Sequence, residues 1–469
     1  MSVPSRGQVA VLPIRADTKP CAIHMVGVGG SGMSALALLL RKMDFSVSGS
    51  DIKESAVTRR LKAAGVRVFL GHDARHVPAA TRMVAYSSAV DLKRNPEIAQ
   101  ARRKGIGLVR RGSLLAQLSH LKRSLTVCGT HGKTTTSSMA GWILDAAGIR
   151  PTVVVGGEIR NIRTNTLVGG SDIIVLETDE SDGSFLETRP WIAVATNVDN
   201  DHLEHYGSMG RLIDAFVSHL SQVAGDGHRV VCRDDKTLMT KVVARLTGLS
   251  VTYGLSPGSD CRAVALCKGR DGFTFTISWK GKPVARVVLR VPGMHNVRNA
   301  LGAAAAAHLA GAPWPKIAKA LASYAGIHRR LEVLGRKSGV VFLDDYGHHP
   351  TEIAATLSAV RDFYSFKRLL VCFQPHRYSR TKMLAGGFAA AFKGVDFVWV
   401  MPIYAASERP IPGISEDTVL RALKRAGIAC AAYPGRTHEL SKELAPGDCF
   451  VTVGAGDVWK VGEDLLRRI

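Results

Sequence analysis

Short apolar runs that end in glycine or polar residues recur along the chain. CAIHMVGV and SLTVC each lead into a glycine-rich segment, and RLLVCF and CFVTV end in polar or glycine-rich turns. Apolar runs without alternation are typical of strands buried on both faces of a parallel sheet. Longer segments such as SALALLLRKM and SSMAGWILDAAG follow the first two runs and predict helices. The pattern therefore predicts an α/β fold with doubly wound sheets, whose ligands bind at the carboxyl ends of the strands.

Length and composition set the scale of this fold. The 469 residues correspond to about three domains of roughly 150 residues each. With 46% hydrophobic and 22% charged residues, the chain is globular rather than disordered. No apolar run reaches the roughly 20 residues that a membrane helix needs, so no stable membrane insertion is expected. The first 20 residues lack a signal-peptide core, and the eight cysteines form no CxxC pair, so we expect a cytoplasmic protein with reduced thiols.

The charge balance favours an anionic ligand. Lysine and arginine number 62 against 39 acidic residues, a net charge of +23. Such a balance suits nucleic acid, anionic lipid or a multiply phosphorylated substrate. The basic residues are spread along the chain and form no recognition helix or aromatic-basic pattern, so we do not expect nucleic acid as a partner.

The first glycine-rich segment has the form G-x-G-x-x-G over residues 27–32. It lies between a predicted strand and a predicted helix, and Asp51 follows the last glycine by 19 positions. Glycines there allow a tight turn and close approach of a pyrophosphate to a helix N-terminus. The motif by itself indicates a diphosphate-containing nucleotide, either NAD or a UDP-sugar.

The second glycine-rich segment, GTHGKTTT at 129–136, predicts a phosphate-binding loop. Its backbone N–H groups can cradle phosphates, Lys133 can reach the β/γ oxygens, and Thr134 can hold Mg²⁺. The standard pattern needs glycine at position 127, where this chain has valine, so the loop is a shortened form.

Later strands deliver acidic and imidazole groups to the same predicted sheet. SDIIVLETDESD ends in Glu177, where a Mg²⁺ ligand is expected beside a phosphate-binding loop. The segment WIAVATNVDNDHLEHYG carries His202, which is either a metal ligand or an ordinary core histidine. Its position at the carboxyl end of a predicted strand of the same sheet favours the role of metal ligand. In the last third, DDYGHHP and QPHRYSRT place many charged groups after apolar strands.

These motifs, in this order, resemble the Mur ligase family. The resemblance rests on HMVGVGGSGMS, GTHGKTTT, ETDESD, the DHL of NVDNDHL, PGMHNVRNA, DDYGHHP, QPHRYSRT and GAGD, and covers residues 22–460. The shortened phosphate loop is that family's own form. The resemblance implies three domains: a Rossmann-like UDP-sugar domain at 1–121, a central P-loop ATP-binding domain at 122–326, and a Rossmann-like amino-acid-binding domain at 327–469.

The resemblance also implies a reaction, in which ATP activates the lactyl carboxylate of UDP-N-acetylmuramate and L-alanine attacks the acyl phosphate. This is the first peptide-adding step of peptidoglycan precursor synthesis, and it implies two Mg²⁺ ions. The sequence departs locally from the family pattern at two places. It has GMSALA for the usual GMSGLA, and at residues 324–330, the family's hinge segment, it has YAGIHRR for the commoner F-x-G-V-x-R-R. No lysine occurs between His202 and Lys236, which favours the branch without a carbamoylated lysine. The sequence leaves the oligomeric state open between monomer and dimer.

Site residues follow from the same resemblance. For ATP they are Gly129, Thr130, His131, Gly132, Lys133, Thr134, Thr135, Asn296, Asn299, Arg330 and Asp345. For the UDP-sugar they are Gly27, Gly29, Gly30, Ser31, Gly32, Met33, Ser50, Asp51, His72, Ser87, Ser88, Ser181 and Asp182. The expected catalytic groups are Lys133, Glu177, His202 and His348, and the expected metal ligands are Thr134, Glu177 and His202. The amino acid is expected at Tyr346, His348, Arg377 and Arg380, because paired arginines can grip a carboxylate in a bidentate manner.

Three other functions compete with this one. A cell-wall recycling ligase that joins a whole peptide to the same UDP-sugar would share the first two motifs, but DDYGHHP argues against it. A nicotinamide dehydrogenase would leave the phosphate loop unexplained. A nucleic-acid-binding protein would rest on net charge alone.

Overall fold

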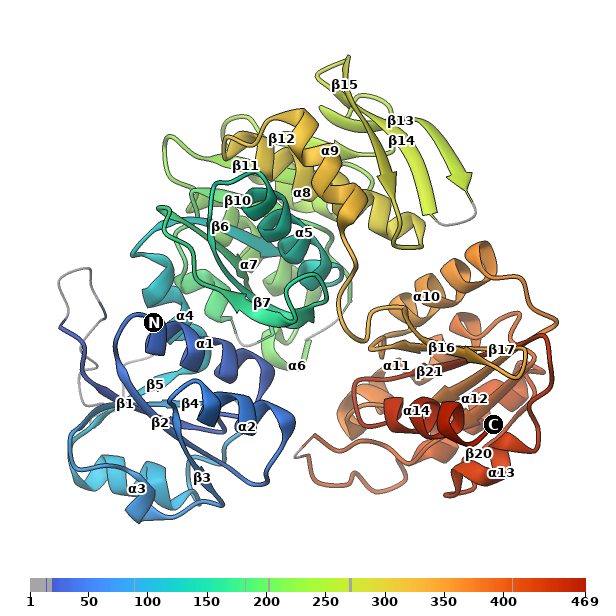
Figure 1. Cartoon of the computed structure of the whole chain (residues 1–469), viewed down its shortest axis with the longest axis horizontal. Helices are drawn as coiled ribbons and strands as arrows, with labels where there is room; N and C mark the ends of the chain where they lie inside the picture. Colours follow the sequence, from blue (N-terminus) through green and yellow to red (C-terminus); the bar gives the residue numbers. More distant parts are fainter. Residues whose placement is uncertain are drawn as a thin grey trace. The chain divides into compact units, whose positions relative to one another are not determined.

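The computed structural model describes residue 14 and residues 19–87, 89–181, 183–200, 203–269, 272–406 and 408–469. The chain forms two compact units. The first contains Met1–Leu266, Thr274–Val288 and Arg298–Tyr324, and the second contains Cys267–Phe273, Leu289–Val297 and Ala325–Ile469. Three mainly parallel sheets carry the fold, as the sequence predicts, with their helices coloured from blue to red along the chain in Figure 1. The predicted domain boundaries at 121/122 and 326/327 stay predictions.

The first sheet has the Rossmann-like order β3-β2-β1-β4-β5, and every pairing in it is parallel. Helix α1 starts directly after the glycine turn and places Leu36 and Leu40 in the core. The elements are β1 (Ala22–Val26), α1 (Ser31–Lys42), β2 (Ser46–Asp51), α2 (Ala56–Ala63), β3 (Arg67–Leu70), the 3₁₀ turn η1 (Ala74–His76), β4 (Thr81–Tyr86), α3 (Pro96–Arg103), β5 (Gly107–Arg110) and α4 (Arg111–Ser119).

The second sheet has ten strands in the order β15-β14-β13-β12-β11-β10-β6-β9-β7-β8. Strand β6, which leads into the phosphate loop, lies between β10 and β9, parallel to both. Its strands are β6 (Arg123–Cys128), β7 (Thr152–Ile159), β8 (Thr164–Leu167), β9 (Ile173–Glu177), β10 (Ile192–Ala195), β11 (His228–Cys232), β12 (Val251–Gly254), β13 (Cys261–Gly269), β14 (Gly272–Trp279) and β15 (Lys282–Leu289). The accompanying helices are α5 (Lys133–Ala146), η2 (Ser184–Glu187), α6 (Leu203–Tyr206), α7 (Met209–Ser221), η3 (Leu238–Val242), η4 (Val243–Arg245), α8 (Met294–Leu309) and α9 (Trp314–Ser323).

The third sheet has the order β16-β17-β21-β18-β19-β20, parallel except for the edge pair β16–β17. Its strands are β16 (Glu332–Lys337), β17 (Val340–Asp345), β18 (Arg368–Phe373), β19 (Phe397–Val400), β20 (Cys430–Ala432) and β21 (Asp448–Val453). Its helices are α10 (Pro350–Phe363), α11 (Tyr378–Ala391), α12 (Glu416–Arg425), α13 (Thr437–Ser441) and α14 (Trp459–Arg468).

Within the first unit, the first sheet's core continues into the second sheet. Leu36 and Leu40 of α1 belong to the same cluster of buried residues as Val154 of β7 and Ile174 and Leu176 of β9. Apolar burial therefore joins the two sheets, which explains why they form one compact unit. In the part of the chain that is described, no helix is long and apolar enough to cross a membrane.

A substitution of Gly49 in β2 would test how tightly the chain packs beneath the first glycine turn. A Cβ there would lie 2.5 Å from the Met25 carbonyl oxygen and 2.8 Å from Val28 Cβ. Gly49→Ala should therefore destabilise the first unit by about 1–3 kcal/mol, because a tightly packed backbone cannot move away without strain. Thermal unfolding should show the loss as a lower Tm.

Gly386 is the matched control, because its Cβ would meet no described atom within 4 Å in helix α11. Gly386→Ala should be neutral or slightly stabilising. Equal Tm losses in the two variants would contradict the packing argument.

Candidate active site

The first glycine turn is held together by the end of strand β2. The N–H groups of Gly27 and Val28 both donate to the Ser50 carbonyl at 2.9 Å. The N–H of Gly29 donates to Asp51 Oδ2 at 2.8 Å. Gly27 has φ +79°, and a Cβ on Gly29 would lie 2.7 Å from Asp51 Oδ2. Hydrogen bonds to Ser50 and Asp51 therefore fix the conformation of the glycine turn. The N-terminus of α1 follows this turn, and a helix N-terminus is a suitable place for an anion to bind.

Several predicted UDP-sugar residues gather at this edge of the sheet. Ser50 Oγ lies 3.1 Å from His72 Nδ1, and the Ser87 N–H donates to the Val26 carbonyl. The Met33 side chain lies in the core with 1% exposure, so only its backbone at the start of α1 can face a ligand. Ser88 and Asp182 lie outside the described residues, as does the side chain of Ser31. Ser181 lies elsewhere, beyond β9, where its N–H donates to Asp179 Oδ1 at 2.9 Å.

The phosphate loop follows β6 and contains two glycines that no other residue could replace without a clash. Gly129 has φ +128°, and its Cβ would collide with Thr196 Oγ1. Gly132 has φ +81°, and its Cβ would lie 2.6 Å from Asn299 Oδ1. Asn299, predicted to contact ATP, is therefore beside the loop. Asn296, at the start of α8, donates to the Pro292 carbonyl at 2.6 Å.

Lys133 begins helix α5 and faces a buried carboxylate. Its Nζ lies 2.9 Å from both oxygens of Glu180, which is fully buried, and 3.3 Å from the Thr130 carbonyl oxygen. Burial opposes the charged ammonium, but the carboxylates of Glu180 and Asp179 outweigh it and raise the pKa of Lys133 above its ordinary value. The loop therefore carries a permanent positive charge whose partner is Glu180.

The second expected pair, Thr134 and Glu177, is in contact. Thr134 Oγ1 donates to Glu177 Oε1 at 3.0 Å, and the Gly156 N–H donates to Glu177 Oε2 at 2.7 Å. A hydroxyl and a carboxylate side by side next to a phosphate loop are the oxygen ligands that suit Mg²⁺. The other expected ligand, His202, lies outside the described residues.

The end of β10 fixes the rest of the loop. Asn197 Oδ1 accepts from the His131 N–H, and its Nδ2 donates to the His131 carbonyl, both at 2.9 Å. The Asp199 N–H donates to Thr130 Oγ1 at 2.9 Å, and His131 Nε2 lies 3.1 Å from Asp199 Oδ2. The loop's conformation is therefore set by side chains that lie more than 60 positions later in the chain.

In the second unit, Asp345 organises the turn that follows β17. Its Oδ2 accepts from the Leu331 N–H at 2.7 Å, and its Oδ1 accepts from the Gly347 N–H and Thr356 Oγ1. Burial raises the pKa of Asp345. Its role toward ATP stays a prediction, and its observed contacts are with Leu331, Gly347 and Thr356 of the same unit.

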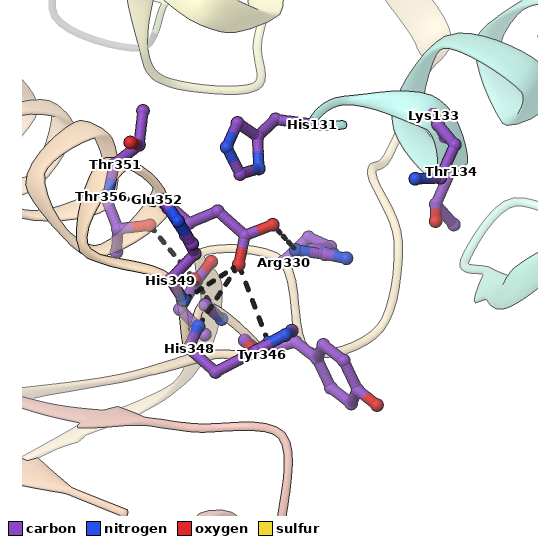
Figure 2. Close-up of polar contacts among 12 residues, drawn as sticks. His131, Lys133, Thr134, Arg330, Tyr346, His348, His349, Thr351, Glu352 and Thr356 are labelled. Carbon is purple, nitrogen blue, oxygen red and sulfur yellow. Dashed lines mark hydrogen bonds and ion pairs between the residues drawn. The ribbon is translucent and has the colours of Figure 1, made fainter. Parts of the chain in front are cut away.

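Glu352 links the predicted groups of this turn, as Figure 2 shows. Its Oε2 accepts from the backbone N–H groups of His348 and His349 at 3.1 and 3.4 Å. Its Oε1 lies 3.9 Å from Arg330 Nη1, and the Arg330 guanidinium lies over the ring of Tyr346. Glu352 was not among the sequence predictions, although its position in the first turn of α10 is typical of a capping carboxylate.

The expected amino-acid residues form a chain of contacts through His376. The ring of His348 lies 5.8 Å from that of Tyr346 and 5.3 Å from that of His376. Arg380, only 7% exposed, places Nη1 3.2 Å from His376 Nδ1. Arg377 precedes α11 with φ +67°, a strained value for a non-glycine residue, and its N–H donates to the Tyr404 carbonyl. Tyr346, His348 and Arg380 are thus brought together. The fourth predicted residue, Arg377, directly follows His376 in the chain.

Sequence reasoning missed His376 and Tyr404 as part of this cluster. Their rings stack at 5.8 Å with an interplanar angle of 11°. His376 lies inside QPHRYSRT and could have been named from that motif. Tyr404 follows the next strand, β19, and only the sheet order brings it to the site.

Models of known protein families match the three segments of the chain that form the three sheets. The models described as Mur ligase family catalytic domain, Mur ligase middle domain, and Mur ligase glutamate ligase domain match residues 22–123, 127–307 and 329–456. The chain is 42% identical to the UDP-N-acetylmuramate–L-alanine ligase of Endomicrobium trichonymphae, over 95% of this chain and 98% of that protein. It is 43% identical to the ligase of the same name from Desulfatibacillum aliphaticivorans, over 96% and 98%.

Solved structures agree with these sequence relatives. The crystal structure of UDP-N-acetylmuramate–alanine ligase from Thermotoga maritima has a TM-score of 0.81 at 30% identity, covering 96% of this chain and 99% of that one. A murein peptide ligase from Psychrobacter arcticus has a TM-score of 0.72 at 23% identity, covering 95% and 98%, which shows a shared fold. With three matching domain models and relatives above 40% identity along nearly its whole length, this chain belongs to the Mur ligase family.

Proposed function

We propose that this protein is an ATP-dependent ligase that joins L-alanine to the lactyl carboxylate of UDP-N-acetylmuramate in peptidoglycan precursor synthesis. The observation that carries the proposal is the identity of 42–43% to ligases of that name over 95–96% of the chain. The phosphate loop, the glycine turn at β1 and the arginine-rich turn after β18 supply the groups that such a reaction needs.

The chemistry starts from a carboxylate, which is a poor electrophile. One carboxylate oxygen attacks the γ-phosphorus of ATP, the bond to the β/γ bridging oxygen breaks, and ADP leaves. The neutral amine of L-alanine then adds to the acyl phosphate, and the tetrahedral intermediate expels inorganic phosphate to leave the amide. The first step brings together two anions, so its rate depends on fixed positive charge.

Lys133 supplies that charge. Its ammonium pairs with the Glu180 carboxylate at 2.9 Å. A bound triphosphate offers oxygens of higher charge at the same loop, so we infer that Lys133 turns from Glu180 to the β/γ oxygens when ATP binds. The backbone of residues 129–132, held by Asn197 and Thr196, positions the phosphates.

Magnesium is part of the proposal. Thr134 and Glu177 would hold one ion, because their oxygens already face each other at 3.0 Å. The ion would offset negative charge on the transferring phosphoryl group. The second ion, with His202, remains a prediction from the sequence.

The amino acid is assigned to the turn after β18. Arg380 and Arg377 supply guanidinium groups for the α-carboxylate, and the rings of Tyr346 and His348 line the same cluster. An imidazole in this cluster can accept the proton that the ammonium loses before attack, because histidine titrates near neutral pH.

A recycling ligase that accepts a whole peptide is the second candidate. A murein peptide ligase shares the fold at 23% identity, whereas the relatives above 40% identity carry the name of the single-amino-acid ligase. The second candidate is therefore less well supported.

Phosphate release tests the proposed function directly. With UDP-N-acetylmuramate, ATP and Mg²⁺, release should depend on L-alanine, with glycine and L-serine as poor substitutes and an alanine-led tripeptide rejected. A preference for the tripeptide over free L-alanine would establish the recycling activity instead.

Lys133→Ala should abolish turnover while UDP-sugar affinity stays nearly unchanged. Removal of a charge that faces a developing anion costs on the order of 10²–10³ in kcat. Steady-state rates and calorimetric titration with UDP-N-acetylmuramate measure the two quantities.

Two further variants serve as controls for Lys133→Ala. Lys316→Ala removes a lysine whose Nζ donates to the carbonyl of Ala147 at the end of α5, and should keep the rate. Lys133→Ala combined with Glu180→Gln removes both buried charges, so a folding defect caused by unpaired Glu180 would be relieved while the rate stays low. Activity of Lys133→Ala within tenfold of wild type would refute the phosphate-loop assignment.

Arg380→Lys should raise the KM for L-alanine far more than the KM for ATP. A lysine is a point charge and cannot reproduce the planar fork that grips a carboxylate. Arg377→Lys should act in the same direction. Arg361→Lys is the control, since Arg361 donates to the carbonyl oxygens of Lys393 and Gly394 on the surface of the same unit. An increase confined to the KM for ATP would assign the arginines to the nucleotide.

A further inference from the structure

Glu97 is a fully buried carboxylate at the start of helix α3, and no motif in the sequence singled it out. Its backbone N–H is capped by Asn95 Oδ1 at 2.9 Å, so its position on the first turn of the helix is fixed. Acidic residues are rarely buried without partners. We therefore ask which groups stabilise the buried carboxylate of Glu97.

Both carboxylate oxygens of Glu97 face polar groups from the first sheet. Oε2 accepts from Ser50 Oγ at 2.6 Å and lies 3.1 Å from His72 Nδ1. Oε1 lies 3.2 Å from His76 Nδ1 and 3.7 Å from His24 Nε2. Strands β1 and β2, the loop after β3 and the turn at η1 thus direct polar groups at one buried acid.

The charge of Glu97 is maintained by these partners. Burial alone would raise the pKa of Glu97 and favour the neutral acid. The interactions of its carboxylate with His24 and Ser50 outweigh this effect of burial, so the pKa lies below its ordinary value. A carboxylate, with acceptor lone pairs only, fixes the direction of each neighbouring hydrogen bond.

Two of these partners belong to the predicted UDP-sugar site. The carbonyl of Ser50 accepts the N–H groups of Gly27 and Val28, so Ser50 links Glu97 to the glycine turn. His72 follows Gly71, whose N–H donates to the Asp51 carbonyl at 2.8 Å. His72 directs Nδ1 at Glu97, and no hydrogen bond joins its other ring nitrogen, Nε2, to any residue that the structure describes, so Nε2 can face a ligand.

We propose that Glu97 is a positioning residue for the UDP-sugar: it holds the Ser50 side chain in place and keeps a proton on His72 Nδ1, so that His72 presents the lone pair of Nε2 to a hydroxyl or N–H donor of the UDP-sugar. The inference rests on the proposed function, because it takes the ligand of this turn to be a UDP-sugar. Glu97 does not touch the ligand and acts through His72 and Ser50.

Glu97→Gln tests the positioning role. The amide keeps the size but can donate as well as accept, so it no longer fixes the proton on His72. The Kd for UDP-N-acetylmuramate should rise about tenfold, equivalent to ~1.4 kcal/mol. The KM values for ATP and L-alanine should stay within about twofold.

Asp448→Asn is the matched control, because Asp448 is a buried carboxylate that pairs with Arg368 in the second unit. It should lower stability without changing the Kd for the UDP-sugar. An unchanged Kd in Glu97→Gln would overturn the proposal.

A double-mutant cycle with His72→Gln separates positioning from a general structural effect. If Glu97 acts through His72, Glu97→Gln should weaken binding much less in the His72→Gln background than in the wild type. Fully additive losses would show that Glu97 supports the fold and not the orientation of His72.

Nitrogen-15 NMR of histidine-labelled protein gives a readout that needs neither turnover nor a stable Glu97 variant. In the free wild-type protein, His72, assigned by its loss in His72→Gln, should carry a proton on Nδ1. A His72 with bare Nδ1 and a proton only on Nε2 would contradict the proposal. Failure of the wild type to bind UDP-N-acetylmuramate would instead refute the proposed function, and the His72 signal would still decide the role of Glu97.

Discussion

The buried ammonium of Lys133 is the charge on which this structure depends. Activation of a carboxylate by ATP brings two anions together, and only a fixed cation or metal ion can offset their repulsion. The protein places Lys133 at the first position of α5, behind a glycine with φ +81°, at the end of a strand buried between two parallel neighbours. The Glu180 carboxylate, 2.9 Å from Lys133 Nζ, pairs with that charge.

The fold explains how such a charge and its ligands meet. Parallel strands deliver their carboxyl ends to one edge, so Glu177 at the end of β9 and Asn197 after β10 reach the loop after β6. The same geometry places Ser50, near the end of β2, and Ser87, after β4, around the glycine turn that follows β1. In the second unit, His348 after β17 and His376 after β18 come into ring contact for the same reason.

Sequence motifs suffice to name the candidate-site residues that lie in continuous segments. Glycine turns, the Lys-Thr pair and the acidic end of β9 are local patterns, and their pairing follows from the parallel-sheet rule. Glu97 could not be found in this way, because its partners Ser50 and His72 lie 47 and 25 positions away and only packing brings them together. Sequence also could not reveal that the oxygens of Asp345 accept hydrogen bonds from Leu331, Gly347 and Thr356, or that the Met33 side chain lies in the core. Motifs report which residue types a reaction needs, whereas burial and hydrogen bonding decide which atoms face a ligand.

The central claim is that the carboxylate is activated by transfer of the γ-phosphoryl group. UDP-N-acetylmuramate with oxygen-18 in both oxygens of the lactyl carboxylate tests this most directly, with mass spectrometry of the phosphate released in the presence of ATP and L-alanine. The account predicts one oxygen-18 atom in each phosphate, because the carboxylate oxygen that attacks the phosphorus leaves with it. Phosphate without the label would contradict an acyl phosphate intermediate.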